Sequence, residues 1–313
     1  MGEFDFISWL RTQQRTSALV SLSAGDDLAI LRWPPDDLLL VGVDQVLDGV
    51  HFDSARHAAR AIGRKAMNRN LSDCAAMACL PAAAVVSVAL PRGASIEYAK
   101  ELYLGLRDAA DPFGCEIVGG DTGSWDGKLV VTVTILGRSA GVTPLTRRGA
   151  KPGDFIYVTG PLGGSLHRDR HLTFEPRLLL AREIAQHRRA SAMIDLSDGL
   201  SRDLRHVCAE SGVGAIVEAA AVPIHADAVA MSEADDSCQA RSTESEARRT
   251  AAARSPLEHA LHDGEDYELL FTSPSDLPAP FLSIGRITED RALYLDRNSH
   301  RETLNSRGWE HPL

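Results

Sequence analysis

Short apolar runs that favour β-strands alternate with longer helical stretches along this 313-residue chain, and the alternation occurs twice. In the first half the pattern predicts strand, helix, strand, helix, strand and strand, at residues 38–43, 55–80, 82–90, 95–110, 116–118 and 128–138. Ser54 is placed to cap the first helix. In the second half we expect helices near 176–187 and at 198–211, and strands at 155–159, 192–196, 215–218, 267–272 and 282–287. This order predicts an α+β protein built on mixed sheets.

A break separates the two halves. Residues 141–151 (GVTPLTRRGAK) combine Gly, Pro and cations with little periodicity. We therefore predict two domains, 1–142 and 143–313, which fits the usual domain size of roughly 100–200 residues. Residues 232–256 contain no Leu, Ile, Val or aromatic residue and bury too little to offset their chain entropy, which predicts a disordered surface insertion.

The composition excludes several classes of protein. With 43 acidic and 33 basic residues the formal charge is −10, so the chain has no electrostatic reason to bind nucleic acid or an anionic membrane. The five cysteines form no C-x-x-C pair, which argues against a zinc site or a disulfide framework. The N-terminus lacks the features of a signal peptide, and no apolar run approaches the ~18 residues of a membrane span. We expect a cytoplasmic protein.

Aspartates recur at or just after apolar segments, often beside Gly or Ser. They are Asp26, Asp27, Asp44, Asp73, Asp121, Asp195 and Asp198. Any one of them alone is more often a turn former or a helix cap than a functional group. Several carboxylates that converge on one pocket repel one another unless cations neutralise them, and Mg²⁺ held by carboxylates and substrate phosphates is the ordinary solution. The pattern therefore predicts phosphoryl transfer.

A glycine-rich turn, VTGPLGG, follows the expected strand at 155–159. Its glycines, Gly160, Gly163 and Gly164, suit either a phosphate-binding loop or an ordinary turn, and a lone glycine-rich turn is weak support for the first. The P-loop, the protein-kinase motifs and the G-x-S-x-G and H-E-x-x-H motifs are all absent from the sequence. The familiar nucleotide-binding and hydrolase designs are thereby excluded.

At these residues the chain resembles the thiamine-monophosphate kinases, members of the superfamily of aminoimidazole ribonucleotide synthetase. The matching motifs are GEF at 2–4, AGDD at 24–27, VDQVLDGVHF at 43–52, NLSDCAAMACLP at 70–81, GGDT at 119–122, LTRRGAKPGDFIYVTGPLG at 145–163, PR at 176–177, IDLSDGL at 194–200, SGVGA at 211–215, GEDYELLFT at 264–272 and RGWEH at 307–311. The resemblance implies a two-domain aminoimidazole ribonucleotide synthetase-like fold. Its N-terminal mixed-sheet domain would bind ATP and Mg²⁺ and form a homodimer, and its C-terminal domain would be α/β layered.

The resemblance also implies an activity and a site, namely ATP-dependent phosphorylation of thiamine monophosphate to thiamine diphosphate with several Mg²⁺ ions. The implied metal ligands are Asp27, Asp44, Asp73, Asp121, Asp195 and Asp198, of which Asp44, Asp121 and Asp198 would act most directly in catalysis. Gly120, Asp121, Arg147 and Ser197 would face ATP. His51, Glu265 and Trp309 would face thiamine monophosphate, although Trp309 could equally cover the core.

The proposed acceptor is itself a phosphate with a second pKa of about 6, so its oxygen is already anionic at neutral pH and needs no general base. We therefore predict direct in-line transfer without a covalent enzyme intermediate.

Two departures from the family pattern leave other functions open. Gly42 and Val43 precede Asp44 where the family carries hydroxyl residues, and the glycine-rich turn reaches Pro176 quickly. The alternatives are a divergent relative that acts on another small phosphorylated or nucleotide substrate, and a catalytically silent protein that binds thiamine phosphate or ATP.

Overall fold

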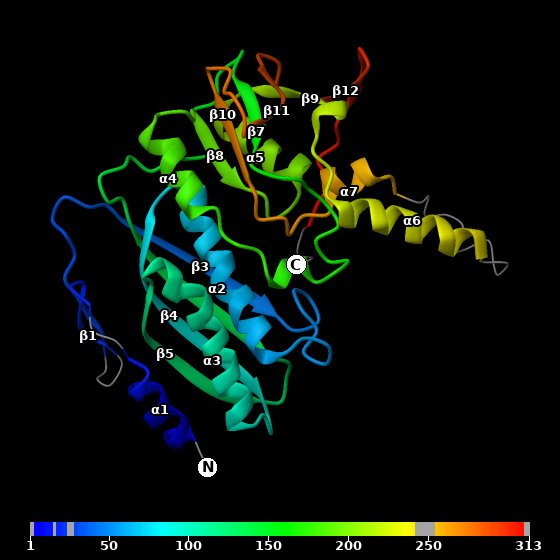
Figure 1. Ribbon diagram of the computed structural model, residues 1–313. Coiled ribbons are helices and arrows are strands. Elements are labelled where there is room, and N and C mark those ends of the chain that lie inside the picture. The colour runs from blue at the N-terminus through cyan, green and yellow to red at the C-terminus, as the bar shows by residue number, and fades with distance from the viewer. Residues whose placement is uncertain (1–2, 15–16, 24–27, 242–253, 310–313) are drawn as a thin grey trace. The chain divides into compact units, whose positions relative to one another are not determined.

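The computed structural model describes residues 3–14, 17–23, 28–241 and 254–309, which fall into two compact units. The N-terminal unit comprises Met1–Pro144 and Leu172–Leu178, and the C-terminal unit comprises Leu145–His171 and Leu179–Leu313 (Figure 1). The division lies at the glycine- and cation-rich stretch, but residues 172–178 return to the first unit, which the sequence did not predict. There the buried Asn68 side chain donates a hydrogen bond of 2.6 Å to the Phe174 carbonyl oxygen.

The N-terminal unit is built on a four-stranded sheet in the order β3-β6-β4-β5. The strands are β3 (Leu39–Leu47), β4 (Leu80–Pro91), β5 (Glu116–Trp125) and β6 (Val130–Arg138). The β4–β5 pair is parallel and the other two pairs are antiparallel. Helices α2 (Ala59–Ala76) and α3 (Ile96–Ala110) cover one face (Figure 1). On that face Val131, Val133 and Ile135 of β6 are buried, as strand alternation requires.

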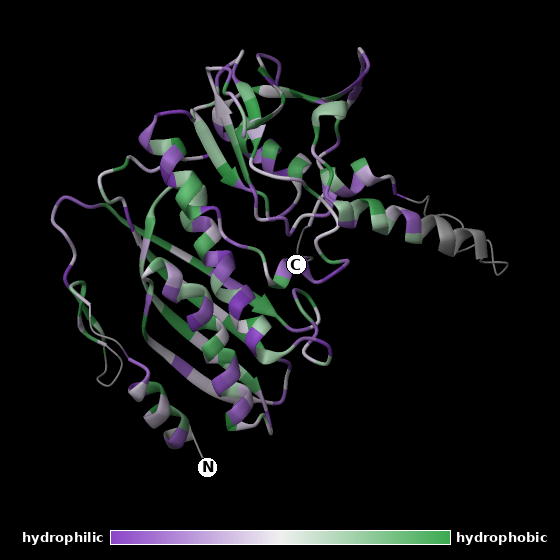
Figure 2. Ribbon diagram, in the orientation of Figure 1, coloured by the Kyte–Doolittle hydropathy of each residue, from purple (hydrophilic) through white to green (hydrophobic). Residues whose placement is uncertain are grey.

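Smaller elements complete this unit. Helix α1 (Glu3–Thr12) contacts α3, where Trp9 meets the ring of Tyr103 edge-on with centroids 5.5 Å apart. Strands β1 (Val20–Leu22) and β2 (Ile30–Leu31) form an antiparallel pair, and the 3₁₀ helix η1 (Asp111–Phe113) follows α3. In Figure 2 the strands of the main sheet are predominantly hydrophobic, whereas α2 and α3 alternate hydrophobic and hydrophilic residues. This is the pattern of helices that lie on a sheet.

The C-terminal unit contains a seven-stranded sheet in the order β13-β12-β9-β11-β7-β10-β8. Its strands are β7 (Phe155–Val158), β8 (Ala192–Asp195), β9 (Gly214–Glu218), β10 (Leu269–Ser273), β11 (Leu282–Thr288), β12 (Leu293–Arg297) and β13 (His300–Thr303). The helices are α4 (Leu178–Gln186), α5 (Leu200–Ser211), α6 (Ala226–Arg241) and α7 (Pro256–His262), with 3₁₀ turns η2 (Arg170–Leu172) and η3 (Ala219–Ala221). One continuous core joins α5 and α7 to the sheet through Leu204, Leu261 and Ile194.

Several elements differ from the sequence-based expectations. Asp44 and Asp121 lie inside strands and not at strand ends. Ser54 does not cap α2, because its amide and hydroxyl donate to the Asp48 carboxylate and α2 begins five residues later, at Ala59. The strands β12 and β13 were not predicted. Among the described residues no helix is both long and apolar enough to cross a membrane.

The segment predicted to be disordered is partly helical. Helix α6 continues through Arg241, and residues 242–253 lie outside the described part of the chain. Ser255 then caps α7 in a capping box with Glu258. The composition argument counted only buried apolar surface, whereas Ala, Glu, Gln and Arg favour helix intrinsically. The prediction was therefore wrong for residues 232–241.

Candidate active site

Two of the predicted metal ligands lie on the helix-covered face of the N-terminal sheet. Asp44 stands opposite the buried Val133, and its carboxylate accepts hydrogen bonds of 2.8 and 3.2 Å from Arg69 of α2. Asp73 lies one turn further along α2. One of its carboxylate oxygens lies 4.0 Å from the position that a Cβ atom would take at Gly42 of β3. The strand and the helix thus bring Asp44 and Asp73 to one place. Arg69 compensates the charge of Asp44, so a metal ion at Asp44 would compete with this guanidinium.

Asp121 lies elsewhere on the same sheet. Asp44 pairs with Val133, Val133 with Val86 and Val86 with Gly120 across neighbouring strands, so these four residues share one face of the sheet. Because side chains alternate along a strand, Asp121 projects from the opposite face. It is also three strand spacings away, about 14 Å at roughly 4.8 Å each. Within this unit the structure therefore does not bring Asp121 together with Asp44. The side chain of Val43 lies on the Asp121 face and is 64% exposed.

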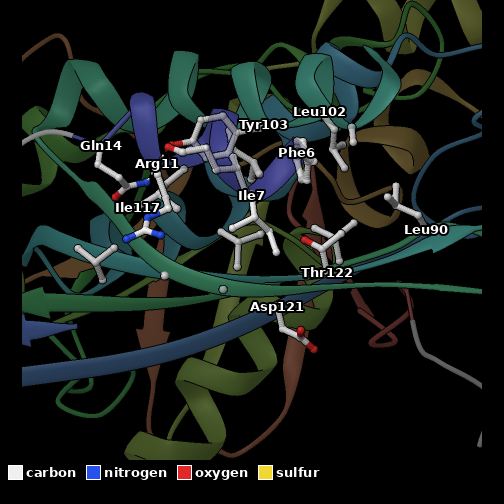
Figure 3. Close-up of a pocket in the computed structure, with 18 of the residues that line it drawn as sticks. Phe6, Ile7, Arg11, Gln14, Leu90, Leu102, Tyr103, Ile117, Asp121 and Thr122 are labelled. Carbon is white, nitrogen blue, oxygen red and sulfur yellow. Dashed lines mark hydrogen bonds between the residues drawn. The ribbon is translucent and has the colours of Figure 1, made fainter. Parts of the chain in front are cut away.

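A cavity of about 650 Å³ lies between α1, α3 and strands β4 and β5. Figure 3 shows Phe6 and Arg11 of α1 and Tyr103 of α3 around it, and Asp121 pointing away on the other side of β5. Gly120 lines the cavity, and a Cβ there would lie 2.0 Å from the Val86 carbonyl oxygen. The walls are mainly apolar and aromatic. Sequence reasoning identified Gly120 but missed Phe6, Arg11 and Tyr103, because helix-borne aromatic residues are usually core residues.

His51 lies in the turn after β3 and is 7% exposed. Its Nδ1 accepts a hydrogen bond of 3.0 Å from the Leu47 amide, and its carbonyl oxygen accepts one of 2.8 Å from the ammonium group of Lys65. Lys65 is fully buried in α2. Because Nδ1 acts as an acceptor, the neutral ring carries its proton on Nε2. The orientation of the His51 ring is therefore fixed by the backbone of the preceding strand.

The acidic residues of the C-terminal unit gather around the turn from β8 to α5. Asp195 ends β8 and is buried, and Asp198 precedes α5 by two residues. The buried Asp203 carboxylate accepts hydrogen bonds of 3.1 Å from the amides of Asp198 and Gly199. Burial raises the pKa of Asp203 well above its usual range, and the charges of Asp198 and Asp195 raise it further. A buried carboxyl group thus fixes the turn that carries the predicted ligands.

Ligand atoms of Asp198, Asp203 and His206 all lie within 4.8 Å of one another. Burial lowers the pKa of His206, and the positive charge of Arg147 lowers it further, which places Arg147 near this turn. Sequence analysis missed Asp203 and His206. The available signal was their spacing, because Asp203 and His206 are three residues apart and therefore share one face of the helix that follows Asp198.

Glu265 and Trp309 meet the same turn. The amide of Glu265 donates a hydrogen bond of 2.8 Å to the Ser197 carbonyl oxygen, and the amide of Trp309 donates one of 3.1 Å to the Asp198 carbonyl oxygen. Glu265 adopts φ +57° and Tyr267 φ +53°, a strained conformation for residues other than glycine. The Trp309 side chain is 45% exposed and does not serve as a core residue. The structure therefore groups the predicted residues of this unit in one place.

The glycine-rich turn is not a free phosphate cradle. The amide of Gly163 donates to both oxygens of Asp266 at 2.9 and 3.0 Å, and the amide of Gly164 donates to Asp263 at 3.1 Å. Arg170 also donates to Asp266, at 3.0 Å. Carboxylates of the same unit therefore already occupy both amides, and a phosphate would meet negative charge there. The hypothesis of a phosphate-binding loop is wrong for these two amides. The remaining predicted ligand, Asp27, lies outside the described residues.

Comparison with known proteins gives a consistent result. Residues 25–139 match the family model for the N-terminal domain of AIR synthase related proteins. The thiamine-monophosphate kinase of Rhodopirellula baltica is 40% identical over 308 residues, which cover 93% of this chain and 91% of that protein. The thiamine-monophosphate kinase of Aquifex aeolicus is 30% identical, and the alignment covers 99% of this chain and 98% of that protein.

Solved structures agree. The thiamine-monophosphate kinase of Stenotrophomonas maltophilia K279a superposes with a TM-score of 0.75 at 30% identity and covers 93% of this chain and 95% of its own. The structure of AaThiL complexed with AMPPCP and TMP has a TM-score of 0.74 at 28% identity, with 99% and 97% coverage. HypE structures at 14–18% identity share the fold alone. The chain belongs to the thiamine-monophosphate kinase family.

Proposed function

We infer that this protein transfers the γ-phosphoryl group of ATP to thiamine monophosphate, giving thiamine diphosphate and ADP. The observation that carries this function is its similarity to thiamine-monophosphate kinases over nearly its whole length, at up to 40% identity among the relatives compared. The neighbouring structure of AaThiL holds AMPPCP and TMP, which are an ATP analogue and the proposed acceptor. The grouping of Asp195, Asp198, Glu265 and Trp309 in one unit supports the same function.

We propose that thiamine monophosphate lies against the turn from β8 to α5. The half-exposed indole of Trp309 offers a flat face to the cationic thiazolium ring, and the Glu265 carboxylate complements its charge. For His51 of the N-terminal unit we propose a substrate contact as well, with the ring held by the hydrogen bond that its Nδ1 accepts from the Leu47 amide. Ser197 and Arg147 would then face the phosphates of ATP, with the Arg147 guanidinium offering two parallel hydrogen bonds.

For the base of ATP we propose the cavity of the N-terminal unit. Its walls include the rings of Phe6 and Tyr103, and the absence of a side chain at Gly120 leaves room beside β5. A flat, largely apolar base suits such a slot. Gly120 faces this cavity, whereas the Asp121 carboxylate projects from the other side of the same edge strand, so Gly120 is the proposed contact to the base and Asp121 is proposed to act on the opposite face.

The donor set fits Mg²⁺. Every proposed ligand is a carboxylate, the hard oxygen donor that this ion prefers. Strand β3 and helix α2 bring Asp44 and Asp73 to one place, and Asp195 and Asp198 lie in the turn from β8 to α5. The pKa of Asp203 is raised mainly by burial and further by the negative charges of Asp198 and Asp195, so negative charge accumulates at this turn. Bound Mg²⁺ would neutralise the charge that accumulates between two phosphorylated reactants. Asp121 is proposed as a further ligand.

The residues themselves supply position and charge, and none needs to act as a base. The acceptor phosphate is largely anionic at neutral pH, so its oxygen can attack directly. Arg147 and the Asp198 turn, both in the C-terminal unit, would orient the phosphates of donor and acceptor. We propose direct transfer without a phosphorylated enzyme, and isolation of such a species on the reaction path would contradict this mechanism.

A homodimer is supported by the uncovered face of the N-terminal sheet. On the face opposite α2 and α3, Leu39, Val41, Val43 and Val85 are all at least 40% exposed. An apolar sheet face of this kind ordinarily packs against another surface. We propose that a second copy covers it and that Asp121, on the same face, completes its site there. A cytoplasmic location, where ATP is abundant, is also our proposal.

The decisive experiment incubates purified protein with ATP, Mg²⁺ and thiamine monophosphate and separates the products by chromatography. Thiamine diphosphate and ADP should form in equal amounts, and reactions with EDTA or with thiamine in place of its phosphate should give neither product in the same time. Binding of both substrates without ADP formation would favour a silent binding protein. Turnover only with another phosphorylated acceptor would favour the divergent phosphotransferase.

A further inference from the structure

The hydroxyl group of Ser201 joins three segments of the C-terminal unit. Ser201 lies in the first turn of α5 and is fully buried. Its Oγ donates a hydrogen bond of 2.6 Å to the Arg307 carbonyl oxygen and accepts one of 3.2 Å from the Arg307 amide. The Nδ1 atom of His262, the last residue of α7, lies 2.8 Å from the same oxygen. One side chain thus ties α5 to α7 and to the end of the chain.

The proton count fixes the role of each partner. A serine hydroxyl carries one proton and two lone pairs. Its proton goes to the Arg307 carbonyl and one lone pair to the Arg307 amide, so the other lone pair accepts from an Nδ1–H group of His262. Each hydrogen-bonding position of the hydroxyl is then used. No other side chain of this size can replace it without leaving a buried polar group unsatisfied.

The segment that follows Arg307 lies directly on the Asp198 turn. Gly308 adopts φ +155°, and a Cβ there would lie 2.3 Å from the Asp198 carbonyl oxygen. That carbonyl accepts the amide hydrogen of Trp309. Residues 307–309 are therefore held at one end by Ser201 and at the other by the backbone of Asp198. Loss of the Ser201 contacts would therefore remove one of these two anchors from the segment.

We propose that Ser201 is a positioning residue for the acceptor substrate, because its hydroxyl holds the 307–309 segment so that the Trp309 indole stands beside the Asp198 turn. The inference rests on the proposed function in one respect, the contact between Trp309 and thiamine monophosphate. Ser201 itself touches no reactant. It acts by restricting the positions that Trp309 can take, which lowers the conformational entropy that is lost when the substrate binds.

The test compares Ser201→Ala with Ser191→Ala. Ser191 is a matched control, because its hydroxyl bonds to Asp154 and Thr272 in the same unit but contacts neither the turn nor the 307–309 segment. In Ser201→Ala the KM for thiamine monophosphate should rise about 5- to 10-fold, as expected for a lost pair of buried hydrogen bonds. The KM for ATP and kcat should stay within about twofold, and Ser191→Ala should change none of these parameters beyond its effect on stability.

A double-mutant comparison separates positioning from general destabilisation. If Ser201 acts through Trp309, adding Ser201→Ala to Trp309→Ala should not raise the KM for thiamine monophosphate further. Independent, multiplicative effects of the two substitutions would overturn the proposal. Should Ser201→Ala fail to fold, Ser201→Cys fills similar volume with a much weaker hydrogen-bonding group and should show the same increase in KM.

Hydrogen exchange gives a readout that does not need activity. The amide of Trp309 should exchange faster in Ser201→Ala than in the wild type and in Ser191→Ala. Unchanged exchange would overturn the proposal even if the KM rose. Faster exchange with an unchanged KM would show that Ser201 holds the segment but that Trp309 does not position the substrate. Faster exchange in a protein that lacks kinase activity would reject the proposed function and keep the structural role of Ser201.

Discussion

The two adjacent glycines of β5 give a sharp test of the N-terminal cavity. A Cβ at Gly120 would lie 2.0 Å from the carbonyl oxygen of Val86 on β4, where ordinary contact begins at about 3.4 Å. A Cβ at Gly119 would meet no heavy atom within 4 Å. Gly120→Ala must therefore push β4 and β5 apart by more than about 1 Å. Gly119→Ala adds the same methyl group without this requirement.

The size of the effect follows from the strand ladder. A separation of that size takes the two nearest β4–β5 hydrogen bonds beyond useful length, at about 1 kcal/mol each, and overpacking adds about 1–3 kcal/mol. We expect Gly120→Ala to lose about 3–5 kcal/mol, which lowers the melting temperature by about 6–20 °C in a unit of this size. The KM for ATP should rise more than the KM for thiamine monophosphate, because the wall of the proposed base cavity moves.

The assay is thermal unfolding, followed by steady-state kinetics at a temperature at which both variants are folded. Gly119→Ala should melt within about 2 °C of the wild type, since alanine also restricts the unfolded chain. Equal melting temperatures for the two variants would refute the argument from the Val86 contact. A destabilised Gly120→Ala with an unchanged KM for ATP would remove the cavity from the nucleotide site.

Three further predictions concern single side chains. Asp44→Asn and Asp121→Asn should each lower kcat by more than about a hundredfold while circular dichroism stays unchanged, because each removes a charge that Mg²⁺ needs, and near-normal turnover would remove that residue from the site. Burial raises the pKa of Asp266 to about 7, so the folded protein keeps a proton that the unfolded chain loses near pH 4. The free energy of unfolding should therefore decrease as the pH rises from about 4 to about 7. Urea titrations at several pH values should show a smaller decrease for Asp266→Asn than for the wild type. Ser255→Ala should lower the melting temperature by about 2–4 °C through loss of the α7 cap, and an unchanged melting temperature would show that the capping box adds no stability.

Local features of the sequence were sufficient to predict most helices and strands of the fold. The alternation of strands and helices was correct for most elements, because side-chain periodicity is set by the nearest neighbours along the chain. The motifs around Asp44, Asp121 and Asp198 were sufficient for the family, since each is a short stretch that can be read without knowing its surroundings. Strand β13 was missed because a short, polar edge strand depends on pairing with its neighbour, and β12 because its five residues are too few to show a clear alternation.

The tertiary structure decided what those residues can do. Only the sheet register shows that Asp44 and Asp121 project from opposite faces. Only the packing of segments about 100 residues apart shows that Asp266 already occupies the amide of Gly163, and that Ser201 holds the end of the chain. Such contacts leave no periodic trace in the sequence, because a hydrogen bond between distant segments depends on how the whole unit folds and not on the residues beside it.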